Sequence, residues 1–253
     1  MSSNLVMPVH AARRISDPAL RDPDTDSLRA MLAAGAEIIE CCRVLHKAGL
    51  NLVGEVLRAQ GDFMELNHYP EDDVFDADTH SQYYYHAHRG MQGEHGHFHT
   101  FVRPPGMPEG MLPIAHPGGE PWPSGRDALS HLIGISMDAY GLPMGLFTTN
   151  RWVTGEAWYA ADDVTRLLER FRIDHAAPSW PVNRWISAMF VLFRPEMQAL
   201  LRSRDAVIAD RAARYPGRDV FEDRGLDITS ELPISVDAQI ARVRAQLIQA
   251  EPR

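Results

Sequence analysis

The sequence predicts an α+β fold, with a central antiparallel β-sheet or small barrel flanked by N-terminal and C-terminal helices. Apolar residues recur at helical spacing towards both ends, whereas residues 82–158 read as strand-rich, with two alternating faces in residues 95–103. Glycine-containing turn signals separate the apolar runs of this middle region. The 253 residues, 45% hydrophobic and 23% charged, fit a single globular domain over 1–253.

The N-terminal quarter is predicted to be an arm followed by two helices. Residues 1–24 are polar and proline-containing, and are expected to be a loosely attached arm. Residues 25–61 are predicted to be helical: Thr25 or Asp26 caps a helix to about Lys47, and a second helix follows Asn51 and ends at Gly61. The acidic segment 62–82 is expected to be a loop that wraps towards the middle region.

The middle region is predicted to contain four strands, at about 82–88, 95–103, 130–138 and 144–153. The link RGMQGE fits a hairpin turn between the first two strands, and AYGLP fits a turn between the last two. Residues 104–125 contain 12 prolines and glycines among 22 residues. This long loop is interpreted either as a lid or as a surface crossover stiffened by proline.

The C-terminal region, residues 161–253, is predicted to be helical. A helix opens at Ala161–Asp162, and Pro181 suits the first turn of the next helix. Another long helix begins at Pro195, and Ser235 is a candidate cap for the last one. The only cysteines, Cys41 and Cys42, are helix neighbours that point about 100° apart, which disfavours a disulfide between them.

Histidine spacing in the middle region indicates a metal site. Five of the twelve histidines fall within residues 86–99, in two groups with two-residue spacing: His86 and His88, and His95, His97 and His99. Residues two apart on a strand share a face, and converging imidazoles most often hold a metal ion. A turn centred on Met91 and Gln92 would place His88 opposite His95 and His86 opposite His97. The other interpretations are a solvated histidine-rich hairpin and metal-free catalytic histidines.

Four neighbouring residues are candidates for the same site. Glu94 is predicted to join as a ligand or general base if a bulge turns it inward, and otherwise lies in water. Tyr84 shares a face with His86 and either donates a hydrogen bond, ligates or only packs. His131 reaches the pocket if its strand pairs beside 95–103. Glu156, flanked by two tryptophans, either orients a ligand histidine, acts as a base with a raised pKa, or is a surface acid.

Two resemblances follow from these motifs. HAHRGMQGE, residues 86–94, resembles the first cupin motif, a His-x-His pair followed by a glutamate, but with a longer spacer between His88 and Glu94. Pro143 and Gly145 resemble the turn of the second cupin motif, and Thr148 stands where that motif has a histidine. GEHGHFHTFVR, residues 93–103, and HLIGISMDAYGLPMGLFTTNRWVTGE, residues 131–156, are similar to an uncharacterised bacterial family along the full chain. That resemblance implies that the histidines are the family's signature, and it implies no activity.

Charge and composition limit the partners. The net charge of −9, without a basic stripe, argues against binding of nucleic acid. No apolar run approaches the length of a membrane span, and the start lacks the apolar core of a secretory signal, so a cytoplasmic protein is expected. An edge strand or the long helices would allow a homodimer.

Three functions fit these observations. The first is a mononuclear non-haem metal enzyme, an iron oxidoreductase or oxygenase that acts on a small molecule. The second is a zinc hydrolase or lyase with three histidine ligands and Glu94 or Glu156 as the base. The third is a copper or zinc carrier or sensor without catalysis. A divalent ion is expected in each case, with iron favoured over zinc or copper. The candidate ligands are His86, His88, His95, His97, His99 and His131.

Overall fold

A seven-stranded mixed sheet forms the centre of the molecule, in the order β1-β7-β6-β5-β4-β3-β2. The computed structural model describes residues 12–15, 23–88, 93–118 and 121–251. Neighbouring strands are antiparallel except for the parallel pair β1 and β7. The predicted α+β class with helices at both ends is confirmed. The strands are β1 (Arg13–Arg14), β2 (Tyr69–Phe75), β3 (Ser81–His86), β4 (Gly96–Val102), β5 (Ser130–Met137), β6 (Pro143–Thr149) and β7 (Ile228–Pro233).

The four predicted strands correspond to β3, β4, β5 and β6. The last of them was predicted too long, because Asn150 caps a short helix, α3 (Arg151–Thr154), and its side chain accepts a hydrogen bond from Arg151 N. Three further strands were not predicted. The edge strand β2 lies in the acidic segment that was expected to be a loop, β7 lies in the expected helical region, and β1 lies in the expected arm.

Six further helices lie in the described part of the chain, and their caps follow the local sequence. Asp24, rather than Thr25 or Asp26, caps the first helix by accepting a hydrogen bond from Ser27 N at 2.8 Å. The second helix ends at Leu57 rather than at Gly61. The predicted cap Ser235 is confirmed. The helices are α1 (Thr25–Lys47), α2 (Leu52–Leu57), α4 (Ala161–Leu168), α5 (Trp180–Leu192), α6 (Arg194–Arg214) and α7 (Val236–Ala250).

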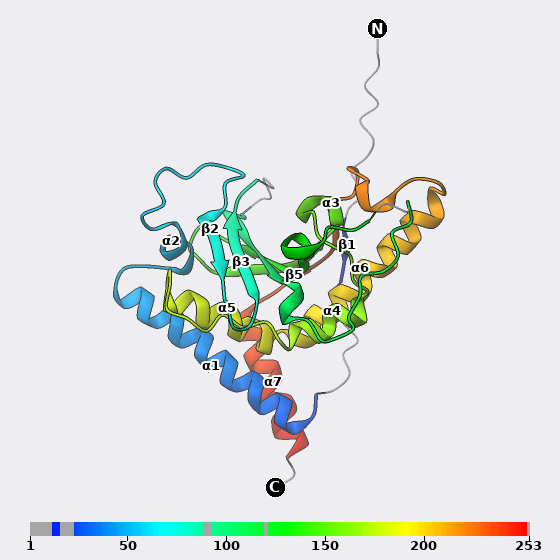
Figure 1. Ribbon diagram of the computed structural model, residues 1–253. Coiled ribbons are helices and arrows are strands. Elements are labelled where there is room, and N and C mark those ends of the chain that lie inside the picture. Colours follow the sequence, from blue (N-terminus) through cyan, green and yellow to red (C-terminus); the bar gives the residue numbers. More distant parts are fainter. Residues whose placement is uncertain (1–11, 16–22, 89–92, 119–120, 252–253) are drawn as a thin grey trace.

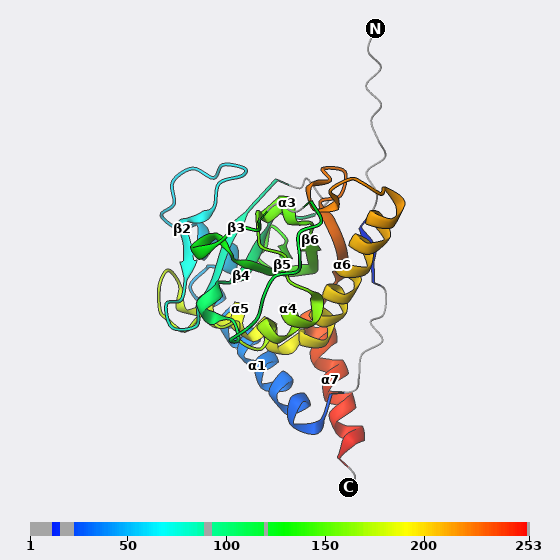
Figure 2. The same cartoon turned by 45° about the vertical axis from the view of Figure 1, so that its right-hand side comes forward.

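The helices gather on one side of the sheet. Figure 1 shows α1, α4, α5 and α7 below the strands, and Figure 2 shows α1 and α7 together at the end of the molecule away from the strands. Two of the helices contact the sheet directly. In α5, Trp185 packs on Phe98 of β4 and Asn183 accepts a hydrogen bond from the Tyr83 hydroxyl at 2.7 Å. In α6, the carbonyl of Leu200 accepts a hydrogen bond from the Ser230 hydroxyl of β7 at 2.9 Å. Within the described residues, no helix has the length and apolarity needed to cross a membrane.

The described residues of the segment 104–125, which lies between β4 and β5 in the chain, pack beside the sheet. Ile114 N donates to the carbonyl of Trp158 at 2.9 Å, and the Trp122 ring lies against Phe221 with centroids 5.4 Å apart. The described parts of this loop are therefore anchored on the segment that follows α3 and on the short turn Val220–Glu222.

Candidate metal centre

The pairing of β3 with β4 places the histidines of the two strands side by side. His86 lies directly opposite His97, as predicted, and Tyr84 lies opposite His99. His88 follows the end of β3 and His95 precedes the start of β4. The backbone N–H of His95 still donates to the carbonyl of Met137 in β5 at 2.8 Å. The predicted turn at Met91 and Gln92 lies outside the described residues.

Three of the predicted ligands converge. One ring nitrogen from each of His86, His88 and His97 lies within 4.8 Å of the other two. Imidazole nitrogens bind a zinc-like ion at about 2.0–2.1 Å, so small ring rotations would bring all three onto one ion. His86 and His97 are buried whereas His88 is exposed, which gives this three-histidine group a side open to solvent.

Glu94 contacts the far side of His97. Its Oε1 lies 2.6 Å from His97 Nδ1, and the two side chains are only 3% and 0% exposed. The Glu94 carboxylate therefore points into the protein, as one of the two interpretations of the sequence predicted, and it contacts the His97 ring. In metal sites a carboxylate on one imidazole nitrogen fixes the ring and leaves the other nitrogen, here Nε2, for the metal. This contact makes Glu94 an orienting partner of His97.

The His86 ring is suited to a metal because nothing else satisfies it. Burial, with smaller contributions from His97 and His88, lowers the pKa of His86 to about 2. The ring is therefore neutral and available as a ligand at neutral pH. Among the described residues, neither of its nitrogens has a hydrogen-bond partner. A buried polar atom without a partner costs free energy, and a bound ion would remove that cost.

A second pair of histidines lies beside the three-histidine group. His99 Nδ1 and His131 Nε2 are 2.9 Å apart. Burial lowers the pKa of His131 to about 3, with smaller contributions from Arg204 and His97. Burial, with smaller contributions from the neighbouring histidines, lowers the pKa of His99 well below its ordinary value. Both rings are therefore neutral, and one donates a hydrogen bond to the other. His99 Nε2 has no partner in the part of the chain that is described.

A register shift in β5 brings His131 to this face. On β5, Gly134 and His131 are three residues apart. Their partners on β4, His99 and Phe101, are only two residues apart. Residues three apart normally face opposite sides of a strand, and the irregularity between the two pairs cancels that alternation. His131 thus reaches the cluster, as predicted, through His99.

His95 is not part of the group, and its predicted shared face with His97 is wrong. His95 Nδ1 lies 2.8 Å from the hydroxyl of Tyr85. Side chains alternate along β3, so Tyr85 points to the face opposite to that of Tyr84 and His86, and His95 lies on the side of Tyr85. The His95 ring also lies against Phe63, with centroids 5.3 Å apart. The physical reason is that the strand begins only at Gly96, so the alternation of β4 does not extend back to His95.

Glu156 is buried next to the histidine pair. Its Oε2 accepts a hydrogen bond from the backbone N–H of His131 at 2.7 Å, and its Oε1 accepts one from the Thr154 hydroxyl at 3.2 Å. Burial raises the pKa of Glu156 to about 7, against the opposing effect of Arg204. The carboxylate holds the backbone of His131 rather than its ring, unlike the predicted orientation of a ligand ring.

Aromatic rings enclose the histidines. Tyr84 lies with its ring centroid 5.1 Å from that of His86, and burial raises its pKa. His68, which the sequence did not single out, stacks on Tyr84 with centroids 3.5 Å apart and has its Nδ1 2.9 Å from Asp73 Oδ1. On the other side Phe147 contacts His97, with centroids 5.3 Å apart. The sequence gives no indication of His68 in the site, because it lies in the acidic segment 62–82 and has no histidine two residues away on either side.

The fold and the site define an α+β protein with a histidine cluster on the sheet face away from the long helices. A family model described as a domain of unknown function (DUF6969) matches residues 32–234, and the chain belongs to this family. The predicted membership of an uncharacterised family is thereby confirmed, whereas the signature segments and the cupin resemblance stay predictions. No curated protein and no solved structure matches the chain.

Proposed function

We propose that the protein is a metal-dependent enzyme with a mononuclear three-histidine site, a non-haem iron oxidoreductase or oxygenase that acts on a small molecule. The convergence of His86, His88 and His97 carries this proposal. Three imidazole ligands leave several positions of an ion free, and the exposed His88 marks the side from which a substrate approaches. An iron ion held there would supply Lewis acidity and one-electron chemistry.

The surrounding residues support catalysis on a small molecule. Glu94 holds the His97 ring, so the position of one proposed ligand is fixed before any substrate binds. Tyr84 and Phe147 enclose the three-histidine group with apolar ring surface, which excludes water from the buried side. The open side and the enclosed side together give a site with one direction of access.

The positions of the carboxylates favour this function over a zinc hydrolase or lyase. Such an enzyme needs a general base beside the metal-bound water. Glu94 is directed at His97 Nδ1, and Glu156 at the His131 backbone and Thr154. Neither arrangement places a carboxylate on the open side of the three-histidine group. The zinc enzyme and the metal carrier or sensor remain as the alternative outcomes of the test.

Metal analysis of protein purified without chelator tests the proposal. We expect about one iron per chain, and an absorbance change when nitric oxide binds at a free iron position. Stoichiometric zinc that is inert to oxidant would instead support the hydrolase or lyase. Weak, exchangeable or multiple metal binding would support the carrier or sensor.

A pair of variants ties the metal to the site. His97→Ala is expected to lose the metal, whereas His175→Ala, a histidine outside the cluster, is expected to retain it. Equal retention by both variants would contradict the site. A protein that binds no metal and whose melting is unchanged by chelator would contradict all three functions.

A further inference from the structure

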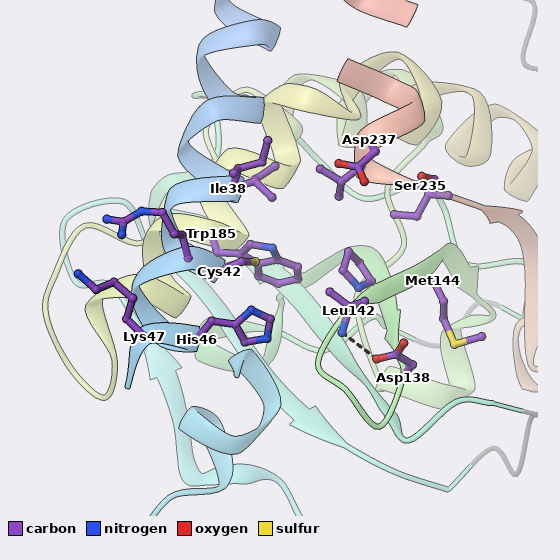
Figure 3. A pocket seen from close by; sticks show the side chains of 15 residues that line it. Ile38, Cys42, His46, Lys47, Asp138, Leu142, Met144, Trp185, Ser235 and Asp237 are labelled. Carbon is purple, nitrogen blue, oxygen red and sulfur yellow. Dashed lines mark hydrogen bonds between the residues drawn. The ribbon is translucent and has the colours of Figure 1, made fainter. Parts of the chain in front are cut away.

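A pocket of about 790 Å³ lies on the helix-covered side of the sheet. Its walls are the C-terminal half of α1, the turn between β5 and β6, and the start of α7 (Figure 3). Trp185 of α5 lines it and packs on Phe98, whose side chain points away from the face that carries the neighbouring His97 and His99. The pocket is therefore separate from the histidine cluster, and its volume is typical of small-molecule sites.

Most of the pocket wall is apolar. Ile38 comes from α1, Trp185 from α5, Met144 from the start of β6 and Val236 from the first turn of α7. Trp185 is fully buried, and its indole N–H has no hydrogen-bond partner among the described residues. Such a wall favours a ligand with a largely apolar body, because burial of that body removes its surface from water.

The charged groups of the wall differ in whether they are already engaged. Lys47 also lines the pocket, but its charge acts on Glu40 and its side chain is turned away from Trp185 (Figure 3). Arg43 is held by both carboxylate oxygens of Glu40 at 2.6 Å each. The carboxylate of Asp138 accepts hydrogen bonds from its own turn, including one from Leu142 N at 2.8 Å. Asp237 has no hydrogen bond or ion pair of its side chain to any described residue. Figure 3 shows the Asp237 carboxylate and the His46 ring on opposite sides of the pocket, both turned towards it.

We propose that this pocket binds a small, largely apolar molecule that carries a protonated amine. The ammonium group lies against the Asp237 carboxylate, which has no ion pair with a described residue, and the apolar body lies against Trp185. His46, on the opposite wall, offers a second polar contact. The net charge of −9 attracts cations to the protein and raises their local concentration.

Three probes with one scaffold and different head groups test this: phenylbutylamine, phenylbutanol and phenylbutyrate, titrated by calorimetry into the full chain. We expect the amine to bind at least about tenfold more tightly than the carboxylate, with the alcohol between them. Asp237→Asn should abolish this preference. Asp210→Asn, an exposed acid of α6 outside the pocket, should retain it.

A second variant tests the location independently of the charge. Leu142 lies on the rim with 50% of its surface exposed, so Leu142→Trp can fill the opening without a change in the core. It should block all three probes. Undetectable binding of the amine to the wild-type chain, equal affinity for amine and carboxylate, or an amine affinity unchanged in Leu142→Trp would overturn the proposal.

Discussion

The carboxylate of Glu94 selects which nitrogen of His97 faces the cluster. Because Oε1 lies 2.6 Å from Nδ1, the ring keeps its proton on Nδ1 and presents Nε2 as a lone-pair donor. Both side chains are almost completely buried, so the contact is little weakened by water. Glu94 therefore orients a proposed ligand, His97, without contacting the ion itself.

Replacement of Glu94 should weaken metal binding without removal of a ligand. We expect Glu94→Ala to lower the metal affinity by about 10–100-fold, and Glu94→Gln by less, because the amide oxygen can still accept the hydrogen bond. Chelator competition measures this. Glu109→Ala, at an exposed loop position, is the control. An affinity that stays the same in Glu94→Ala would show that the His97 contact does not orient a ligand.

Glu156 predicts a pH dependence of its own. Burial raises its pKa in the folded state to about 7, whereas an unperturbed glutamate has the value 4.5. Between these values the folded chain holds a proton that the unfolded chain has lost. The stabilising contribution is therefore fully present below about pH 4.5 and is lost as the pH rises through about 7.

The variant Glu156→Gln should remove this dependence. We expect the free energy of unfolding of the wild type, relative to that of the variant, to be lower at about pH 8 than at about pH 5. Urea unfolding at both pH values measures it, and Glu169→Gln, an exposed acid at the end of α4, is the control. A difference that is constant with pH would contradict a raised pKa of Glu156.

At the scale of the elements, a glycine in β5 makes room for the aromatic ring that covers the histidines. A Cβ at Gly134 would lie 2.2 Å from Cζ of Phe147. The Phe147 ring therefore lies directly over the backbone of β5, where it contacts both His97 and His99. The absence of a side chain at Gly134 thus allows the Phe147 ring to lie against the histidines.

Gly134→Ala should consequently destabilise the fold, by about 1–3 kcal/mol, because either Phe147 or β5 must shift. Gly145→Ala in β6 is the matched control, since its added Cβ would meet its nearest atom, Leu232 O, at 3.5 Å, an ordinary contact. Urea unfolding compares the two. Equal stabilities would show that the ring is not confined by Gly134.

The predicted elements show what local sequence can and cannot determine. A hairpin turn centred on Met91 and Gln92 predicted that His86 lies opposite His97, and the strand pairing confirms it, because the position of a turn sets the register of a hairpin. The two-residue histidine spacing failed at His95, where the start of β4 rather than the alternation decides the direction of the ring. The edge strand β2 was missed because its solvent-facing acids conceal the strand pattern, and His68 was missed with it.

At the scale of the whole molecule, the sheet separates two environments. Helices α5 and α6 cover one face, and the other face carries buried histidines, among them His86, His99 and His131. Their pKa values in the folded state lie below the usual value of 6.5, to about 2 for His86 and about 3 for His131. The unfolded chain therefore binds protons below about pH 6.5 that the folded chain cannot bind.

The metal-free protein should accordingly lose stability as the pH falls from about 6.5 towards 3, because acid favours the unfolded chain. Urea midpoints at several pH values measure this. The slope should be smaller in His131→Gln and unchanged in His46→Gln, which lies outside the cluster. A wild-type midpoint that does not fall with acid would contradict the burial of neutral histidines.

X-ray absorption spectroscopy of the metal-loaded protein tests the central claim, a single ion held by His86, His88 and His97, most directly. The account predicts one ion per chain with about three imidazole nitrogens, near 2.0–2.1 Å for zinc, and a spectrum that changes in His97→Ala but not in His95→Ala. A metal without imidazole ligands, or a spectrum that His97→Ala leaves unchanged, would contradict it.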